Sequence, residues 1–440
     1  MLRKALFFAV PLCLAIGLIA ESAAHASDSS GDYKQLLQWI SSPFDSKNLT
    51  PGRIYTERDA AVLKQFLPQP VWSLYIYPGM ALEVGKTGDY PVDSEFVKET
   101  RANRDKATID SDGEIRGFNG MGWPFDPSQL SPADLQIALK VLWDFWYRPQ
   151  HDDYYMPMKM WLRGVGGKDD RVMQFVSTES QYVGRRGKPG GLLVPEEQEV
   201  ENKSWMEFLS PKDVWGTQMI ITKFRDHHRD DNVVAYTRRE RRSRRMSASE
   251  RMDPFMGTDL LIEDFFGFAG QVPEWRWEYL GRRKVLATMN VRSNVDWGGP
   301  NGWVPQGARY ELRDCHVLAG TPRNSADPYG KRILFLDAQR LWTTWMLGYD
   351  HDGRFWKTDQ HTLAWSDDFK VSKGSQGNPG LRYCRYDANT RGHRILHVGE
   401  TTIDVKKQEA TLFHCYTCCY RMDSKEAAER YSDKNMGAAN

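Results

Sequence analysis

The sequence lacks an excess of charge of either sign. Lysine and arginine together number 59 and aspartate and glutamate 58 in 440 residues, which gives a formal net charge of +1. The chain therefore has no bulk charge that would draw it to nucleic acid. Its hydrophobic content of 40% and charged content of 27% are those of an ordinary globular protein, which excludes disorder and a collagen-like state.

The sequence also lacks the short motifs that mark common enzymes. It contains no G-x-S-x-G, no H-E-x-x-H, no phosphate-binding loop and no dinucleotide-binding fingerprint. Two patterns could suggest metal ligands, but only weakly: Asp226-His227-His228 and His393-x-x-x-His397. The second pair lies on a predicted strand, where residues four apart are separated by about 13 Å, too far to bind one metal ion. We therefore predict no metal, no cofactor and no catalysis.

Long apolar runs are absent after residue 26, so we expect the mature chain to be soluble. Residues 1–26 are typical of a secretory signal peptide: Arg3 and Lys4 form a positive start, an apolar run over residues 5–20 follows, and Ala24-His25-Ala26 fits the cleavage rule. An uncleaved membrane anchor is the alternative, but the run is shorter than the ~20 residues a spanning helix needs. We predict export, with cleavage after Ala26.

Cysteine is scarce. Of six cysteines, five remain after cleavage: Cys315, Cys384, Cys415, Cys418 and Cys419. In an oxidising compartment some should pair, and because their number is odd at least one stays free or pairs between chains. The C-x-x-C from Cys415 to Cys418 fits a structural disulfide, a redox pair or half of a zinc site. We name Cys415 and Cys418 as disulfide candidates.

Aromatic residues are abundant, with 16 Trp, 19 Tyr and 19 Phe, and they predict a broad apolar core or an apolar cavity. From Tyr154 onward apolar and polar residues alternate with the period of a strand, most clearly in WRWEY at 275–279. Many short strands with few helices favour a mainly β, large antiparallel sheet that is curved or barrel-like. The candidate strands are 154–162, 171–183, 216–224, 232–237, 275–279, 284–291, 308–319, 331–337, 340–349, 355–366 and 394–414.

Helical patterns are confined to short segments. We predict helices over Tyr33–Ile40 and Thr56–Phe66, a strand over Val71–Tyr77, and a helix that begins at the N-cap Ser131 and ends near Tyr147. Residues 257–268 read as a helix whose acidic residues face the helix dipole rather than do acid–base chemistry. These acidic residues are Asp259, Glu263 and Asp264. The expected organisation is a signal peptide over 1–26, a single domain over 27–423 with a helical and loop-rich start, and a polar C-terminal tail over 424–440.

The densest charge run lies at residues 238–245. A solvated strand end or hairpin accounts for it, and contact with anionic lipid headgroups or with a partner is the alternative. The candidate contact patch consists of Arg238, Arg239, Arg241, Arg242, Arg244 and Arg245.

Several segments in order resemble a known family. They are GFNGMGWPF at 117–125, the Trp-bearing helix before Tyr147, GTDLLIEDFFGF at 257–268, WRWEYLGRRKVLATM at 275–289, ARYELRDCHVLAG at 308–320 and KRILFLDAQRLWTTWMLGYDHDGRFWK at 331–357. Together they resemble a bacterial exported family of unknown function that is grouped with the outer-membrane lipoprotein-sorting (LolA/LolB-like) proteins. The resemblance spans roughly residues 110–368. The cysteine-rich end and the dense arginine run depart from it.

The resemblance implies an unclosed antiparallel β-barrel with helices packed in its mouth. It implies a periplasmic, non-catalytic carrier or chaperone whose half-barrel binds a lipid or another hydrophobic molecule, with an envelope transporter or outer-membrane protein as a partner. An envelope scaffold or adaptor and a thiol-redox protein are the alternatives. From the ring-rich segments we name as cavity candidates Phe265, Phe268, Trp275, Trp277, Tyr279, Trp342, Trp345 and Met346.

Overall fold

The computed structural model describes residues 31–185, 188–247, 250, 252–370, 393–416, 418–419 and 422–437. The predicted signal peptide, Cys384 and the side chain of Cys418 lie outside this description. Within the described residues, no helix is both long enough and apolar enough to cross a membrane.

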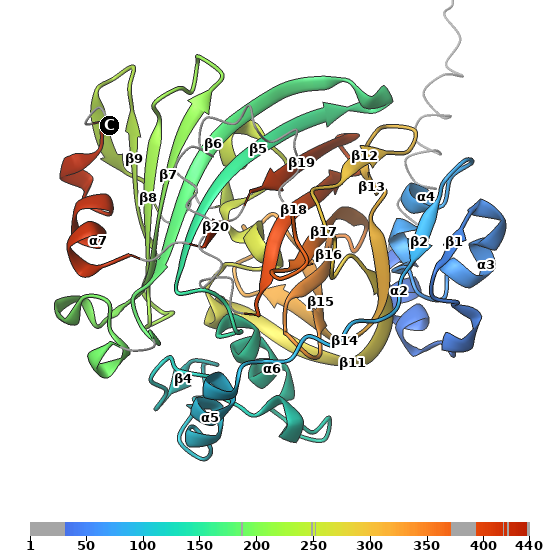
Figure 1. Cartoon of the computed structure of the whole chain (residues 1–440), viewed down its shortest axis with the longest axis horizontal. Coiled ribbons are helices and arrows are strands. Elements are labelled where there is room, and N and C mark those ends of the chain that lie inside the picture. Colours follow the sequence, from blue (N-terminus) through green and yellow to red (C-terminus); the bar gives the residue numbers. More distant parts are fainter. Residues whose placement is uncertain are drawn as a thin grey trace, which may run out of the picture.

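One large sheet forms the body of the protein (Figure 1). All of its strands pair antiparallel except β2 and β14, which run parallel, and β11 and β20 join as side branches. No pairing among the described residues joins β10 to β1 or β11, so the sheet is an unclosed barrel, as predicted. Its order is β1 (Arg53–Tyr55), β2 (Leu82–Val84), β14 (Arg309–Pro322), β15 (Lys331–Asp337), β16 (Thr343–Tyr349), β17 (Phe355–Trp365), β18 (Ile395–Asp404), β19 (Glu409–Cys415), β5 (Asp153–Gly164), β6 (Asp169–Gln181), β7 (Val200–Ser210), β8 (Gln218–Phe224), β9 (Asn232–Thr237) and β10 (Arg242–Arg245), with β11 (Trp275–Ala287) on β14 and β20 (Cys418–Cys419) on β5.

Two small hairpins and six helices complete the described chain. The hairpins are β3 (Thr108–Ile109) with β4 (Ile115–Arg116), and β12 (Asp296–Gly298) with β13 (Val304–Gln306). The α-helices are α2 (Gly31–Ser41), α3 (Ala60–Leu63), α4 (Trp72–Tyr75), α5 (Ser94–Ala102), α6 (Ile137–Trp146) and α7 (Ser424–Arg430). A 3-10 segment, η10 (Ile262–Gly267), crosses the inside of the sheet and contacts β16 and β17.

The two faces of the sheet are covered differently. On the outer face, α2 to α4 pack at one end and α7 at the other, on opposite sides of the molecule in Figure 1. On the inner face lie α6 and η10. Because side chains alternate between faces, neighbouring residues of one strand serve different layers. In β15, for example, Phe335 belongs to the core under α2 to α4 and Leu334 to the core under α6.

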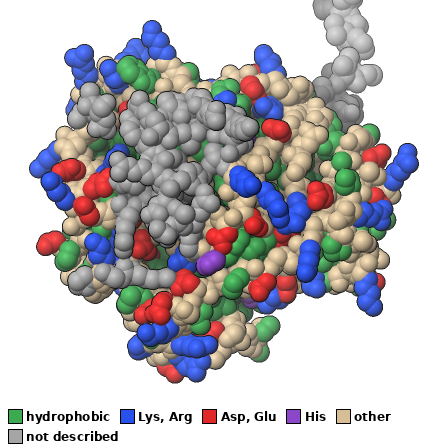
Figure 2. All heavy atoms as spheres, in the orientation of Figure 1, with side chains coloured by type: hydrophobic (Ala, Val, Ile, Leu, Met, Phe, Trp, Pro, Cys, Tyr) green, Lys and Arg blue, Asp and Glu red, His purple; other side chains and the backbone are tan. Residues whose placement is uncertain are grey.

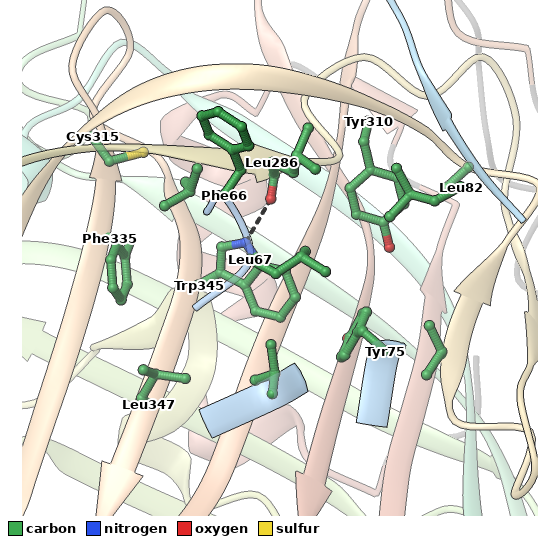
Figure 3. Close-up of a cluster of buried hydrophobic side chains, with 14 of the residues drawn as sticks. Phe66, Leu67, Tyr75, Leu82, Leu286, Tyr310, Cys315, Phe335, Trp345 and Leu347 are labelled. Atoms are coloured by element: carbon green, nitrogen blue, oxygen red, sulfur yellow. Dashed lines mark hydrogen bonds between the residues drawn. The ribbon is translucent and has the colours of Figure 1, made fainter. Parts of the chain in front are cut away.

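The core under α2 to α4 is filled by aromatic and aliphatic side chains. Trp345 lies at its centre, fully buried, and its indole Nε1 donates a hydrogen bond to Leu286 O at 2.9 Å (Figure 3). The ring of Tyr75 meets the Trp345 ring edge-on at 5.1 Å, and its hydroxyl donates to Gln360 at 2.7 Å. This part of the sheet, the closed half, is therefore filled on its outer face by these side chains, and the core under α6 packs on its inner face.

Most predicted strands are confirmed, and β9 and β15 have the predicted bounds. The two strands expected on either side of Gly281 are one strand, β11, with a bulge at Leu280 just before that glycine, because β14 is long enough to pair with both parts. β7 had no counterpart among the predicted strands. The predicted tail is also part of the fold: Ala427 and Tyr431 are buried, and the Tyr431 hydroxyl donates to Ser180 at 2.8 Å.

The strand predicted over Val71–Tyr77 is wrong. Its β-branched and aromatic composition fits a strand, but the chain forms a 3-10 turn and then α4. A helical turn lets the Trp72 indole donate to Leu67 O at 2.9 Å while Tyr75 reaches the core. Tertiary packing therefore overrides the local preference.

The predicted helix bounds before β5 and before β11 also need correction. Asp134 accepts a hydrogen bond from the backbone of Gln136 at 2.8 Å, which holds the chain in a turn, so α6 begins at Ile137 rather than after Ser131. Residues 257–268 form 3-10 turns, with non-helical backbone at Phe265 and Phe266.

We predict that Trp345→Ala lowers the free energy of unfolding by about 3–5 kcal/mol, because it opens a cavity in the closed half and leaves Leu286 O without its donor. Trp215→Ala is the matched control, since Trp215 is 47% exposed, and it should cost less than about 1 kcal/mol. Urea unfolding followed by circular dichroism measures both, and equal losses would contradict the assignment of Trp345 to the core.

Candidate ligand cavity

The other half of the barrel is hollow. A cavity of about 1560 Å³, part of it open to solvent, lies against the inner face of β5 to β8. Its far side is formed by Phe265 and Phe266 of η10, by Trp146 to Arg148 at the end of α6, and by the loop at Gly120–Gly122. His397 of β18 and Phe413 of β19 complete the wall.

The strand register sorts the wall into an apolar end and a polar end. Toward one end, Met158 pairs with Phe175, and Ser177 pairs with Met206. Four positions further along β6 and β7, Gln181 pairs with Asn202, and Asn202 pairs with Lys223 of β8. All of these side chains line the cavity. The cavity therefore offers a graded surface that suits an amphipathic molecule.

Four methionines line the cavity: Met121, Met156, Met158 and Met206. Methionine is unbranched and polarisable, so it adapts to apolar partners of irregular shape. Together with the phenylalanines of the wall they form a surface that accepts apolar groups without fixing one ligand geometry.

A buried cation lies at the wall. The Arg148 guanidinium stacks on the rings of Phe145, Phe266 and Trp342 at 4.3–5.3 Å, and its Nη1 donates to Phe145 O at 2.9 Å. Burial lowers the pKa of Arg148 to about 10, so the group stays charged at neutral pH. Burial raises the pKa of Glu179, on β6 across the cavity, while Arg148 and Lys223 lower it. The wall thus combines charge with apolar surface.

A buried ion pair holds η10 in place over the sheet. Arg332 Nη2 lies 2.8 Å from Asp264 Oδ1, and neither side chain is exposed. Tyr329 donates to both Asp264 oxygens at 3.0 Å, and the Leu261 backbone donates to Oδ2 at 2.9 Å. Arg332 also donates to Glu263 O at 2.9 Å. These contacts explain why an acidic residue stands at position 264, where the sequence pattern predicts a carboxylate that faces a helix dipole.

The end of η10 fits closely onto β16. Thr343 donates to Phe266 O at 2.7 Å, and Gly267 has a φ of +87°. A Cβ at residue 267 would lie 2.6 Å from the Thr343 methyl carbon, so this position requires glycine. Phe266 itself has a φ of +59°, which is uncommon for a bulky residue. This turn directs both phenylalanines of η10 to the cavity.

Comparison with known proteins identifies the chain's family. The model of the family described as protein of unknown function (DUF1329) matches residues 57–415. The chain belongs to this family. The resemblance seen in the sequence is therefore confirmed.

Three solved structures are similar to parts of this chain at low identity. A DUF1329 family protein from Desulfovibrio piger is 17% identical, with a TM-score of 0.45, over 67% of this chain and 96% of that one. A putative outer membrane lipoprotein-sorting protein domain from Vibrio parahaemolyticus is 16% identical, with a TM-score of 0.43, over 64% and 92%. A LolA superfamily protein from Nitrosomonas europaea is 11% identical, with a TM-score of 0.36, over 66% and 96%. A search of curated proteins finds no match.

Two of the eight predicted cavity residues lie on the cavity, Phe265 and Phe268. The other six do not line the cavity and pack in or against cores, and five of them lie on strands that α6 or α2 to α4 cover. Trp275 and Met346 lie in the core under α6, and Trp277 and Tyr279 pack against that core. Trp345 lies in the core under α2 to α4. Trp342 lies in a smaller cluster beside Leu363 and Trp365. The Met-rich strands β5 to β8 that form the cavity wall were missed, although their methionines are visible in the sequence.

The predicted disulfide candidate Cys415 is a buried free thiol in the structure, and the side chain of the other candidate, Cys418, lies outside the described residues. Its Sγ faces inward and lies 3.9 Å from His397 Nδ1. Burial raises the pKa of Cys415 well above its usual range, whereas a redox-active thiol needs a lowered pKa.

The arginine run forms the β9–β10 hairpin at the edge of the sheet, as the solvated-hairpin interpretation expects. Its six arginines are exposed. Arg238 lies over the Trp215 ring at 3.8 Å, and Arg244 pairs with Glu250 at 2.9 Å. On the described part of the face seen in Figure 2, basic and acidic side chains are interspersed.

We predict that Asp264→Asn lowers the free energy of unfolding by about 3–5 kcal/mol, because it keeps the side-chain shape but leaves the buried Arg332 charge uncompensated. Asp352→Asn is the control, since its pair with Arg354 is solvent-exposed, and it should cost at most about 1 kcal/mol. Chemical denaturation measures both variants, and a loss at Asp264 no larger than the control would refute the anchor.

We predict that Cys315 and Cys415 resist alkylation by iodoacetamide in the folded protein and react after unfolding without reductant. Both thiols are buried and burial raises the pKa of each, so little thiolate is present near pH 8. Peptide mass spectrometry of labelled protein measures this. A Cys415 that stays unlabelled after unfolding, until a reductant is added, would restore the disulfide.

Proposed function

We propose that the protein is a periplasmic, non-catalytic carrier or chaperone that binds a lipid or a similar amphipathic molecule in the hollow half of its barrel. The single observation that carries the proposal is the graded cavity between β5–β8 and η10. The apolar tail of the ligand would lie against Met158, Phe175 and Met206. Its head would lie near Asn202 and Lys223.

The lining of the cavity supports this proposal. Its space of about 1560 Å³, which includes open solvent, is lined by methionine and phenylalanine side chains at one end and by polar side chains at the other. At ~25 cal/mol per Å², burying about 400 Å² of apolar ligand surface contributes on the order of 10 kcal/mol before ordering costs. In the closed half the core under α6 packs against the inner face, with Leu334 and Met346 buried, whereas the inner face of β5 to β8 borders the cavity.

A carrier must also meet the proteins or membranes between which it moves its ligand. We keep the exposed arginines of the β9–β10 hairpin as the proposed contact patch, since they lie in solvent at the edge of the sheet next to the cavity wall. The export signal over residues 1–26 supports the periplasmic location.

We predict that the delipidated protein binds a fluorescent fatty-acyl probe and that Phe265→Asp weakens this binding at least tenfold, about 1.4 kcal/mol. The substitution replaces an apolar ring of the wall by a charge that a bound acyl chain would desolvate. Leu135→Asp, on a fully exposed side chain, is the control and should bind like the wild type.

Fluorescence titration with matched circular dichroism spectra of both variants checks this prediction. The absence of probe binding by the wild type, or equal binding by Phe265→Asp, would contradict the assignment of the cavity.

A further inference from the structure

Two histidines and a glutamate converge on the inner face of β17 and β18. His361 Nδ1, His397 Nε2 and Glu400 Oε2 lie 3.1–3.3 Å from one another. All three side chains are almost completely buried. The carrier mechanism uses none of them, although His397 borders the cavity.

A β-bulge brings the three side chains together. On a regular strand, residues three apart point to opposite faces, which would separate His397 from Glu400. Here Glu400 pairs with His361 and Gly399 with Thr362, but Leu363 pairs with His397, so Val398 is the extra residue of a bulge. Because of the bulge, the side chain of His397 lies on the same face of the sheet as those of His361 and Glu400. This is why the sequence pattern gave no metal signal.

The triangle of donor atoms has the dimensions of a metal site. In tetrahedral zinc sites, with ligands at about 2.0–2.1 Å, neighbouring ligand atoms lie about 3.3 Å apart. The observed separations of 3.1, 3.3 and 3.2 Å nearly match one face of such a tetrahedron. Two imidazoles and a carboxylate are a common zinc donor set, and a fourth position is left for water or for a donor atom of a cavity ligand.

Hydrogen bonding alone accounts poorly for the cluster. The three donor atoms make three contacts of at most 3.3 Å, and each contact needs one proton if it is a hydrogen bond. A neutral imidazole carries only one ring proton. No hydrogen bond of good geometry from the described residues reaches Glu400 Oε2, although the atom is buried. A cation shared by the three atoms satisfies all of them at once.

Groups around the triangle have the arrangement of an outer shell. The second ring nitrogen of His361, Nε2, lies 3.1 Å from Asp359 Oδ2, the partner type of carboxylate–histidine–metal triads, although this contact lacks hydrogen-bond geometry. Thr402 donates to Asp359 Oδ1 at 3.3 Å, and Cys415 Sγ lies on the other side of the His397 ring.

From this geometry we propose that His361, His397 and Glu400 bind one divalent transition-metal ion, of the zinc type, inside the barrel. Asp359 is a positioning residue that orients His361. The proposal does not depend on the carrier function, because His361 and Glu400 lie outside the cavity wall and His397 only borders it.

The test uses the full chain, exported and purified without a histidine tag, stripped with a chelator and titrated with Zn²⁺. Equilibrium dialysis with elemental analysis should give one zinc per chain for the wild type. Glu400→Gln and His361→Gln should abolish stoichiometric binding, and Asp359→Asn should weaken it about 10–100-fold. His316→Gln, at a buried histidine that contacts Tyr279 on another part of the sheet, is the control and should keep binding.

X-ray absorption of the zinc-loaded wild type keeps the test decisive even where a variant does not fold. Two imidazoles and a carboxylate around zinc support the proposal, and a thiolate shell overturns it. It is equally overturned by a wild type that binds no zinc or by folded ligand variants that bind it undiminished. Fatty-acyl probe binding is measured on the same samples, so that the carrier proposal is tested separately from zinc binding.

Discussion

The arrangement of the inner face depends on the buried pair between Asp264 and Arg332. A buried carboxylate and guanidinium are costly to desolvate and are held only where every donor and acceptor is placed. Tyr329 and the backbone around Leu261 and Glu263 supply those partners. The pair fixes η10 across the sheet, and η10 in turn supplies the two phenylalanines that face the cavity.

The same sheet does two different things on its two halves. The closed half is packed on both faces, by the core under α2 to α4 with Trp345 on its outer face and by the core under α6 on its inner face. Along β5 to β8 the inner side chains are methionines, small polar residues and a few rings, and within the described part of the chain a cavity separates them from η10. An unclosed barrel tolerates this asymmetry, because α7 covers the outer face of the hollow half and supplies the apolar contacts that stabilise it.

The sequence predicts the class of fold well and the site less well. Alternation of apolar and polar residues finds most strands, since a two-residue period depends on local pattern alone. The alternation does not tell which strands face a cavity. The tryptophans of β11 and β16 are therefore predicted as cavity residues, although helices far away in the chain cover them. Leu280 and Val398 show a second limit: a bulge depends on the pairing partner, and it changes which side chains share a face.

The central claim is that the hollow half of the barrel is occupied by an amphipathic molecule in the cell. The most direct measurement is native mass spectrometry, followed by lipid extraction, of the protein isolated from the envelope of cells that export it. The account predicts a stoichiometric lipid or related molecule that is lost on delipidation. A protein that emerges with an empty cavity and takes up no envelope lipid when mixed with it would contradict the account.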